Sequence, residues 1–244
     1  MNGPDPRLSA GRLGPALLVP LALLLSACGG GDAPRRPASE AAAPADPQPA
    51  GGEARHIGAT VAAPPAPEGK AVAVFAGGCF WCMEAPFERL EGVESVLSGY
   101  AGGREVGPSY QDVSHGHTGH LESVRVLYDP AQVGYARLLE VFFVNVDPTQ
   151  DDGQFCDRGA HYRTAIFVGD DEERRLAEAA RAEAQETLGR PVVTELREAG
   201  PFYVAEDYHQ DFYRTNPGHY RRYREGCGRD RRLQELWGER APHH

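Results

Sequence analysis

The sequence is poor in cysteine and in positive charge, and its longest apolar run is too short to cross a membrane as a helix. Only 5 of its 244 residues are Cys, far below the density of a disulfide-stapled small domain, so these thiols are expected to do chemistry rather than replace a core. Acidic residues outnumber basic ones by 35 to 25, which argues against a nucleic-acid partner. With 41% apolar residues, the chain has room for one ordinary domain and additional segments.

The first 27 residues have the layout of a secretory signal. Arg7 and Arg12 precede the apolar run 13–25, and the run leads into Leu25-Ser-Ala-Cys28-Gly29. This stretch resembles the bacterial lipobox, and the resemblance implies removal of residues 1–27 and acylation of Cys28. We therefore expect a bacterial cell-envelope protein held on a membrane by lipidated Cys28 and facing the periplasm or exterior. An ordinary signal that happens to end near Cys28 is the alternative.

Residues 28–69 are rich in Pro, Ala and Gly and have no apolar periodicity. Such a composition cannot bury enough apolar surface to order itself, so this segment is expected to be a disordered tether. The folded domain is then residues 70–244, including a C-terminal tail.

Apolar spacing within the domain predicts alternating strands and helices. Strands are expected at 70–76, 95–98, 122–128, 162–168 and 192–196, helices at 80–90, 132–145 and 170–188, and a loop at 99–103. This order favours an α/β or α+β fold over a β-sandwich.

Cys79 is the most informative residue of the chain. It follows Gly77-Gly78 at the expected start of a helix, where the glycines leave it uncovered and where unpaired N–H groups and the helix dipole favour a thiolate. Cys82 lies three residues on, at the spacing that permits a disulfide with Cys79. A thioredoxin-like dithiol and a pair of inert buried thiols remain alternatives for this C-x-x-C.

Metal and haem sites fit the cysteines less well. A structural zinc site would need a second C-x-x-C pair, but Cys156 and Cys227 stand alone, and a c-type haem site would need His where Met83 stands. The histidines at 115, 117 and 120 have a spacing that fits a Gly-rich loop better than a zinc site.

The block Gly78-Cys79-Phe80-Trp81 resembles the signature of the A-type peptide methionine sulfoxide reductases. Further blocks match in order: 99–103, Tyr110, 119–122, 147–149, 157–159, 162–163 and 206–210. The resemblance implies an α+β fold, a two-layer sandwich around a mixed β-sheet, with no cofactor and no metal. It also implies thiol-dependent reduction of methionine-S-sulfoxide, in oxidised proteins and as the free amino acid, as repair of oxidative damage.

The resemblance assigns roles to five residues of this chain. Cys79 is the nucleophile that attacks the sulfoxide sulfur and becomes a sulfenic acid. Glu122 is the proton donor, which requires burial and a raised pKa. The hydroxyls of Tyr110 and Tyr162 hold the sulfoxide oxygen, and Asp157 falls at the family's supporting acid.

The aromatic pair Phe80 and Trp81 is expected to form the pocket for the substrate methyl group, because an aromatic face accommodates both a methyl group and a polarised sulfur. Taken singly, Trp81, Tyr110 and Tyr162 fit a core as well as a site. The ordered set of blocks favours the site.

The thiol that resolves the Cys79 sulfenic acid has two candidates. Family members commonly use a cysteine in a C-terminal tail, so the resemblance favours Cys227, between Gly226 and Gly228, over Cys82. Cys156 adjoins Asp157 and comes last. Thioredoxin or a thioredoxin-like reductant is the expected partner that returns the disulfide to thiols.

A second function from another class remains open at this point. Cys79 and Cys82 could serve a membrane-tethered thiol-disulfide exchange or binding module. The Arg-rich stretch 221–232 is expected to be a solvated, partly paired helix face.

Overall fold

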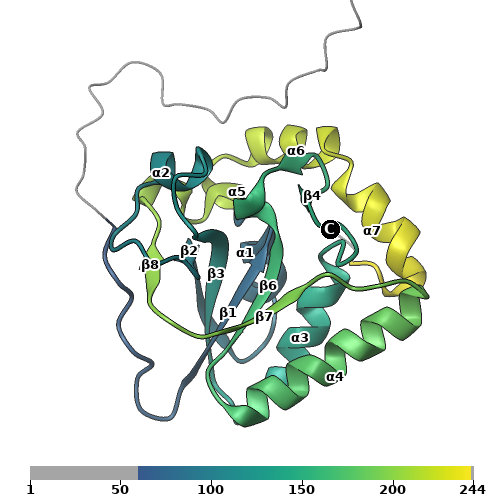
Figure 1. Ribbon diagram of the computed structural model, residues 1–244, viewed down its shortest axis with the longest axis horizontal. Coiled ribbons are helices and arrows are strands. Elements are labelled where there is room, and N and C mark those ends of the chain that lie inside the picture. The colour runs from purple at the N-terminus through teal and green to yellow at the C-terminus, as the bar shows by residue number, and fades with distance from the viewer. Residues whose placement is uncertain (1–59, 243–244) are drawn as a thin grey trace, which may run out of the picture. The chain divides into compact units, whose positions relative to one another are not determined.

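The computed structural model describes residues 60–242 (Figure 1). The expected signal, Cys28 and most of the expected tether therefore lie outside the described residues. The strands are β1 (Ala71–Gly77), β2 (Val93–Ala101), β3 (Leu121–Tyr128), β4 (Gly153–Gln154), β5 (Asp157–Arg158), β6 (Thr164–Val168), β7 (Glu195–Glu198) and β8 (Phe202–Val204). The α-helices are α1 (Trp81–Glu88), α2 (Tyr110–Ser114), α3 (Tyr135–Val144), α4 (Asp171–Leu188), α5 (Phe212–Thr215), α6 (Pro217–Gly226) and α7 (Arg229–Trp237).

Six strands form one mixed sheet in the order β7-β6-β1-β3-β2-β8. β6 and β7 are parallel, and the other neighbours are antiparallel. β4 and β5 form a separate two-stranded hairpin. The α+β fold with a mixed sheet that the sequence implied is confirmed.

The larger core lies between the sheet and helices α1 and α3. Phe75 of β1 stacks between Phe87 of α1 and Phe142 of α3, with ring centroids 5.1 and 5.2 Å away. This packing fixes the C-terminal half of β1 against α1 and α3. The β1–α1 turn, which carries Cys79, is thereby supported on both sides.

A smaller apolar cluster covers the opposite face of the sheet, and residues 60–69 contribute to it. The Ala63 N–H donates to the Phe202 carbonyl at 2.8 Å, and Arg125 donates to the Pro64 carbonyl at 2.8 Å. The sequence assigned these residues to the tether, yet here they extend the sheet beside β8.

Element boundaries differ from expectation where glycine or packing decides. The stretch 99–103 was expected to be a loop, but β2 continues to Ala101. Gly99 permits this, because a Cβ there would lie 2.2 Å from the Tyr203 carbonyl of β8. The expected strand 192–196 begins later, at Glu195, and the helix expected from 132 begins at Tyr135.

The C-terminal tail forms the helices α5, α6 and α7, drawn in yellow-green and yellow in Figure 1. α5 packs against α1, and α6 packs against α7. The tail thus returns to the end of the molecule where α1 begins. Among the helices described in residues 60–242, none combines the length and the apolar character that a membrane span requires.

Candidate active site

Cys79 lies in the tight turn between β1 and α1. Gly78 has φ of +79°, and a Cβ at Gly78 would meet Gln154 Cβ at 2.5 Å, so both the backbone conformation and the space require glycine there. The turn brings Gln154 and the Tyr162 carbonyl beside Gly78. Cys79 itself is only 5% exposed, whereas the sequence suggested that nothing covered it.

The two thiols of the C-x-x-C are free and interact with each other. Burial raises the pKa of Cys79 well above its ordinary value, which reverses the effect expected from the helix N-terminus. The reason is position: α1 begins only at Trp81, and desolvation outweighs the helix end. The hydrogen bond from Cys79 lowers the pKa of Cys82 to about 6. The two pKa values are shifted in opposite directions, so Cys82 ionises more readily than Cys79.

Two buried carboxyl groups flank this pair. Glu122, at the start of β3, is 2% exposed, and its Oε2 accepts a hydrogen bond from the Phe80 N–H at 3.2 Å. Asp157 of β5 accepts a hydrogen bond from the Tyr223 hydroxyl at 2.5 Å, and burial raises its pKa. The structure thus brings both acids predicted from the sequence to the Cys79 turn.

An aromatic cluster surrounds the other side of the turn. The His209 ring lies 4.9 Å from Phe80 and 4.5 Å from Tyr110, and it accepts a hydrogen bond from Trp81 Nε1 at 3.2 Å. Trp81 stacks on Phe212 of α5 at 3.7 Å. Burial lowers the pKa of His209 to about 3, so this ring is neutral. The His209 ring therefore contacts Phe80, Trp81 and Tyr110.

Two buried arginines of the tail were missed from the sequence. Arg224 and Arg229 are 5% and 1% exposed, although the whole stretch 221–232 was expected to be solvated. Arg229 Nη2 donates to the Gly77 and Asn145 carbonyls, at 3.1 and 2.9 Å. Both guanidinium groups favour the Cys82 thiolate. These arginines recur at helical spacing with the half-buried Tyr220 and Tyr223. That spacing was the signal in the sequence that could have indicated their burial.

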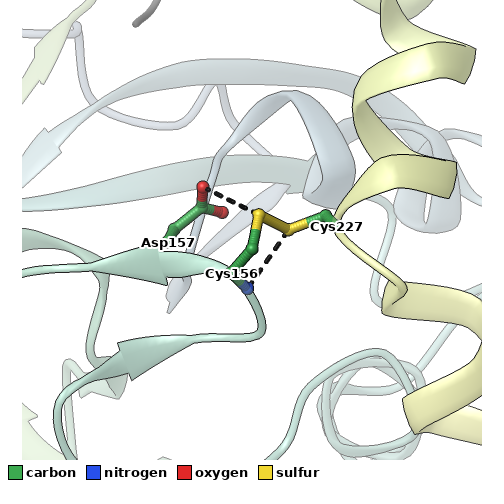
Figure 2. A group of neighbouring side chains, drawn as sticks. All are labelled: Cys156, Asp157 and Cys227. Carbon is green, nitrogen blue, oxygen red and sulfur yellow. Dashed lines mark hydrogen bonds between the residues drawn. A yellow bond between two sulfur atoms is a disulfide. The ribbon is translucent and has the colours of Figure 1, made fainter. Parts of the chain in front are cut away.

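The remaining cysteines form a disulfide between Cys156 and Cys227 (Figure 2). The sequence favoured Cys227 as the thiol that attacks Cys79, but here Cys227 is already bonded to Cys156. Cys156, Asp157 and Cys227 also gather three possible metal-ligand atoms within 4.8 Å. With both sulfurs in a disulfide, neither is a thiolate, so the group does not fit a metal in this oxidation state. An open groove of about 520 Å³ lies beside Cys227.

Comparisons with known proteins converge on one family. Residues 71–241 match the family model for peptide methionine sulfoxide reductase. The chain is 51% identical over 169 residues to MsrA 2 of Rhizobium meliloti, covering 69% of this chain and 84% of that protein. It is 47% identical over 175 residues to MsrA of Bacillus velezensis, covering 71% of this chain and 99% of that protein.

Solved structures agree with this match. The reduced form of Mxr1 from Saccharomyces cerevisiae superposes with a TM-score of 0.59 at 28% identity, covering 63% of this chain and 90% of that one. Methionine sulfoxide reductase A of Corynebacterium diphtheriae gives a TM-score of 0.56 at 32% identity, covering 62% of this chain and 77% of that one.

Proposed function

This chain belongs to the peptide methionine sulfoxide reductase family and is a peptide-methionine (S)-S-oxide reductase, and we propose which of its side chains carry the reaction. The observation on which the proposal rests is the Cys79–Cys82 pair, two free, buried thiols that are hydrogen-bonded to each other beside the Glu122 carboxyl group.

Cys79 passes its proton to the Cys82 thiolate, to which it is hydrogen-bonded, and its sulfur attacks the electrophilic sulfur of methionine sulfoxide. The sulfur–oxygen bond of the substrate breaks, the oxygen passes to Cys79, and the products are methionine and a Cys79 sulfenic acid. Glu122 supplies the proton to the sulfoxide oxygen, because its carboxyl group accepts a hydrogen bond from the N–H of Phe80, the residue next to the Cys79 nucleophile. Tyr110 and Tyr162 orient that oxygen with their hydroxyls.

Cys82 resolves the sulfenic acid. Cys82 gives up its proton, its sulfur attacks Cys79 sulfur, and a disulfide forms while the sulfenic oxygen leaves with that proton as water. Three features support Cys82 over Cys227: its pKa is lowered to about 6, Arg224 and Arg229 stabilise its charge, and Cys227 is bonded to Cys156. A thioredoxin-like dithiol then reduces the Cys79–Cys82 disulfide.

The assignment is tested by peptide mapping after reaction with one equivalent of a methionine-S-sulfoxide peptide, without added reductant. We expect a Cys79–Cys82 disulfide, with Cys156–Cys227 unchanged. In Cys82→Ser protein, one turnover persists and Cys79 remains a sulfenic acid that dimedone traps. A Cys79–Cys227 disulfide in the wild-type protein would instead restore Cys227 as the resolving thiol.

We further propose that the enzyme is a lipoprotein of the bacterial cell envelope, anchored through Cys28. The support is the sequence Leu25-Ser-Ala-Cys28 directly behind an apolar run. An enzyme held there repairs oxidised proteins outside the cytoplasm, where disulfides such as Cys156–Cys227 also persist.

A further inference from the structure

The Cys156–Cys227 disulfide joins the catalytic hairpin to the C-terminal tail. Cys156 lies in the turn between β4 and β5, and Cys227 ends α6, 71 residues later. The noncovalent contacts between the β4–β5 hairpin and the tail also lie close to this disulfide. The proposed reaction uses only the Cys79 and Cys82 sulfurs, so it assigns no role to the Cys156–Cys227 disulfide.

The hairpin that carries Cys156 has little stability of its own. β4 and β5 contribute two residues each, and an isolated two-stranded hairpin is marginal in water. Phe155, in its turn, adopts φ of +56°, which is unfavourable for a residue with a side chain. Hydrogen bonds to the preceding loop, from the Phe155 N–H to Gln150 Oε1 and from Gln154 Nε2 to the Asp147 carbonyl, both at 2.7 Å, hold part of this turn. The rest of its support has to come from contact with another part of the chain.

The tail supplies that contact at points on both sides of the disulfide. The Arg229 guanidinium lies 4.3 Å over the Phe155 ring, and the Cys156 N–H donates to Cys227 Sγ at 3.2 Å. The Tyr223 hydroxyl, one turn before Cys227 on α6, donates to Asp157 Oδ2 at 2.5 Å.

The disulfide also lies directly against the supporting acid. Cys156 Sγ is 3.7 Å from Asp157 Oδ1, and Figure 2 shows the Asp157 side chain alongside the bridge. The charge of Asp157 acts on both Cys79 and Cys82. A displacement of this hairpin would therefore change the electrostatic environment of the reacting thiols.

We propose that the Cys156–Cys227 disulfide is a covalent clamp that positions Asp157 for the reaction by locking the β4–β5 turn to α6, and that it carries no electrons. The proposal rests on the proposed function, in which Cys79 and Cys82 react within the electrostatic reach of Asp157. The clamp limits the separation of α6 from the hairpin, so the Tyr223–Asp157 hydrogen bond stays formed while substrate enters and leaves. When the disulfide is reduced, water can compete with the Tyr223 hydroxyl for Asp157, and the hydrogen bond between them is formed for less of the time.

The test is a single-turnover measurement, because the Cys79–Cys82 pair supplies both electrons and no external reductant touches the clamp. The double variant Cys156→Ser/Cys227→Ser is compared with wild-type protein whose clamp is intact and whose other two thiols are reduced, as verified by peptide mapping. We expect the rate at saturating substrate to fall about tenfold, as for loss of one hydrogen bond to a charged group, with half-saturation unchanged.

Tyr223→Phe provides the matched control, because it keeps the ring and removes only the hydroxyl that Asp157 accepts from. Alone it should lower the rate to a similar extent. Combined with the double serine variant it should add little, because both changes disrupt the same hydrogen bond. Additive effects would mean that the disulfide does not act through Tyr223 and Asp157.

Two outcomes overturn the clamp. One is an unchanged single-turnover rate in the double variant. The other is transfer of the wild-type Cys79–Cys82 disulfide to reduced Cys156 and Cys227, seen by peptide mapping, since that makes the pair an electron relay.

If the serine variant does not fold, fully reduced wild-type protein, freed of reductant, takes its place. An Asp157→Asn variant with unchanged rate refutes the role of Asp157, whereas a slowed Asp157→Asn beside an unaffected double variant refutes only the clamp.

Discussion

At the scale of single residues, the two cysteines of one turn acquire opposite acid–base behaviour from their surroundings. Cys79 is desolvated and donates its hydrogen bond, so its thiol form is favoured. Cys82 accepts that bond and faces two buried guanidinium groups, so its thiolate is favoured. The Cys79 proton can pass to Cys82 along this hydrogen bond when Cys79 attacks, and the lowered pKa of Cys82 favours its loss again when the sulfenic acid is resolved.

This division predicts a distinct thiolate titration. Thiolate absorbance near 240 nm should reveal one group that ionises with a pKa of about 6 in the reduced protein. Cys79→Ala should raise that pKa, because the hydrogen-bond donor that stabilises the thiolate is gone. Cys82→Ala should abolish the titration near neutral pH, and a thiolate that persists in this variant would place the charge on Cys79.

Glu84 of α1 predicts a pH dependence of folding stability. Its side chain is 1% exposed and accepts from Ser98 Oγ and from the Asp211 N–H, but burial still raises its pKa to about 8. Between an unfolded pKa of about 4.3 and a folded pKa of about 8, the folded protein holds one more proton, so stability falls as pH rises through this window.

Glu84→Gln should remove this pH dependence, because an amide does not ionise. Urea unfolding at pH values of about 5 and about 8 should show the variant gaining on the wild type by on the order of 3 kcal/mol. Parallel stability profiles for the two proteins would show that Glu84 ionises normally in the fold.

At the scale of elements, the five-residue helix α2 places a site residue at its first position. Tyr110 begins α2, and Ser109 caps it: Ser109 Oγ accepts from the Asp112 N–H at 3.2 Å, while Asp112 Oδ2 accepts from the Ser109 N–H at 3.1 Å. A helix this short depends on its cap, because it has too few internal hydrogen bonds to stabilise itself.

Ser109→Ala should therefore loosen Tyr110 and raise the substrate half-saturation severalfold, with a stability loss of about 1 kcal/mol. Asp170→Ala is the matched control, because Asp170 caps the long helix α4 by accepting from the Glu173 N–H at 2.8 Å. It should cost similar stability and leave the half-saturation unchanged. Equal kinetic effects of the two variants would show that the cap does not act through Tyr110.

Elements with strong local signals were predictable from the sequence, and those that depend on distant packing were not. The Gly-bounded β1 and the acid-capped α4 fall within one residue of expectation. The end of β2 was missed because Gly99 resembles a loop residue, although a side chain there would collide with the Tyr203 carbonyl. The three-residue strand β8 is too short to leave an apolar pattern. The tail was expected to hold a solvated helix over 221–232, but it forms three polar helices whose buried residues are mostly aromatic and Arg rather than aliphatic.

At the scale of the whole molecule, the site is assembled from segments that are far apart in the chain. The residue types of the C-x-x-C and of the blocks around Glu122 and Asp157 suggested the chemistry, because they match a known pattern. The neutralising partners could not be found that way, since Arg224 and Arg229 become buried only when the tail folds back against the Cys79 turn. The Cys156–Cys227 pairing is likewise a consequence of that return, not of local spacing.

The proposed attachment to a membrane is a property of the whole chain and depends on one residue. The net charge of −10 means that an anionic bilayer repels the protein, so no electrostatic attraction supplements the acyl chains. Cys28→Ser should therefore release the enzyme fully from the membrane fraction, as precursor or soluble protein, and abolish labelling by a radioactive fatty acid. Cys227→Ser, a matched change in the tail, should keep both the label and the membrane location. Label that persists in Cys28→Ser, or membrane retention without label, would refute the anchor.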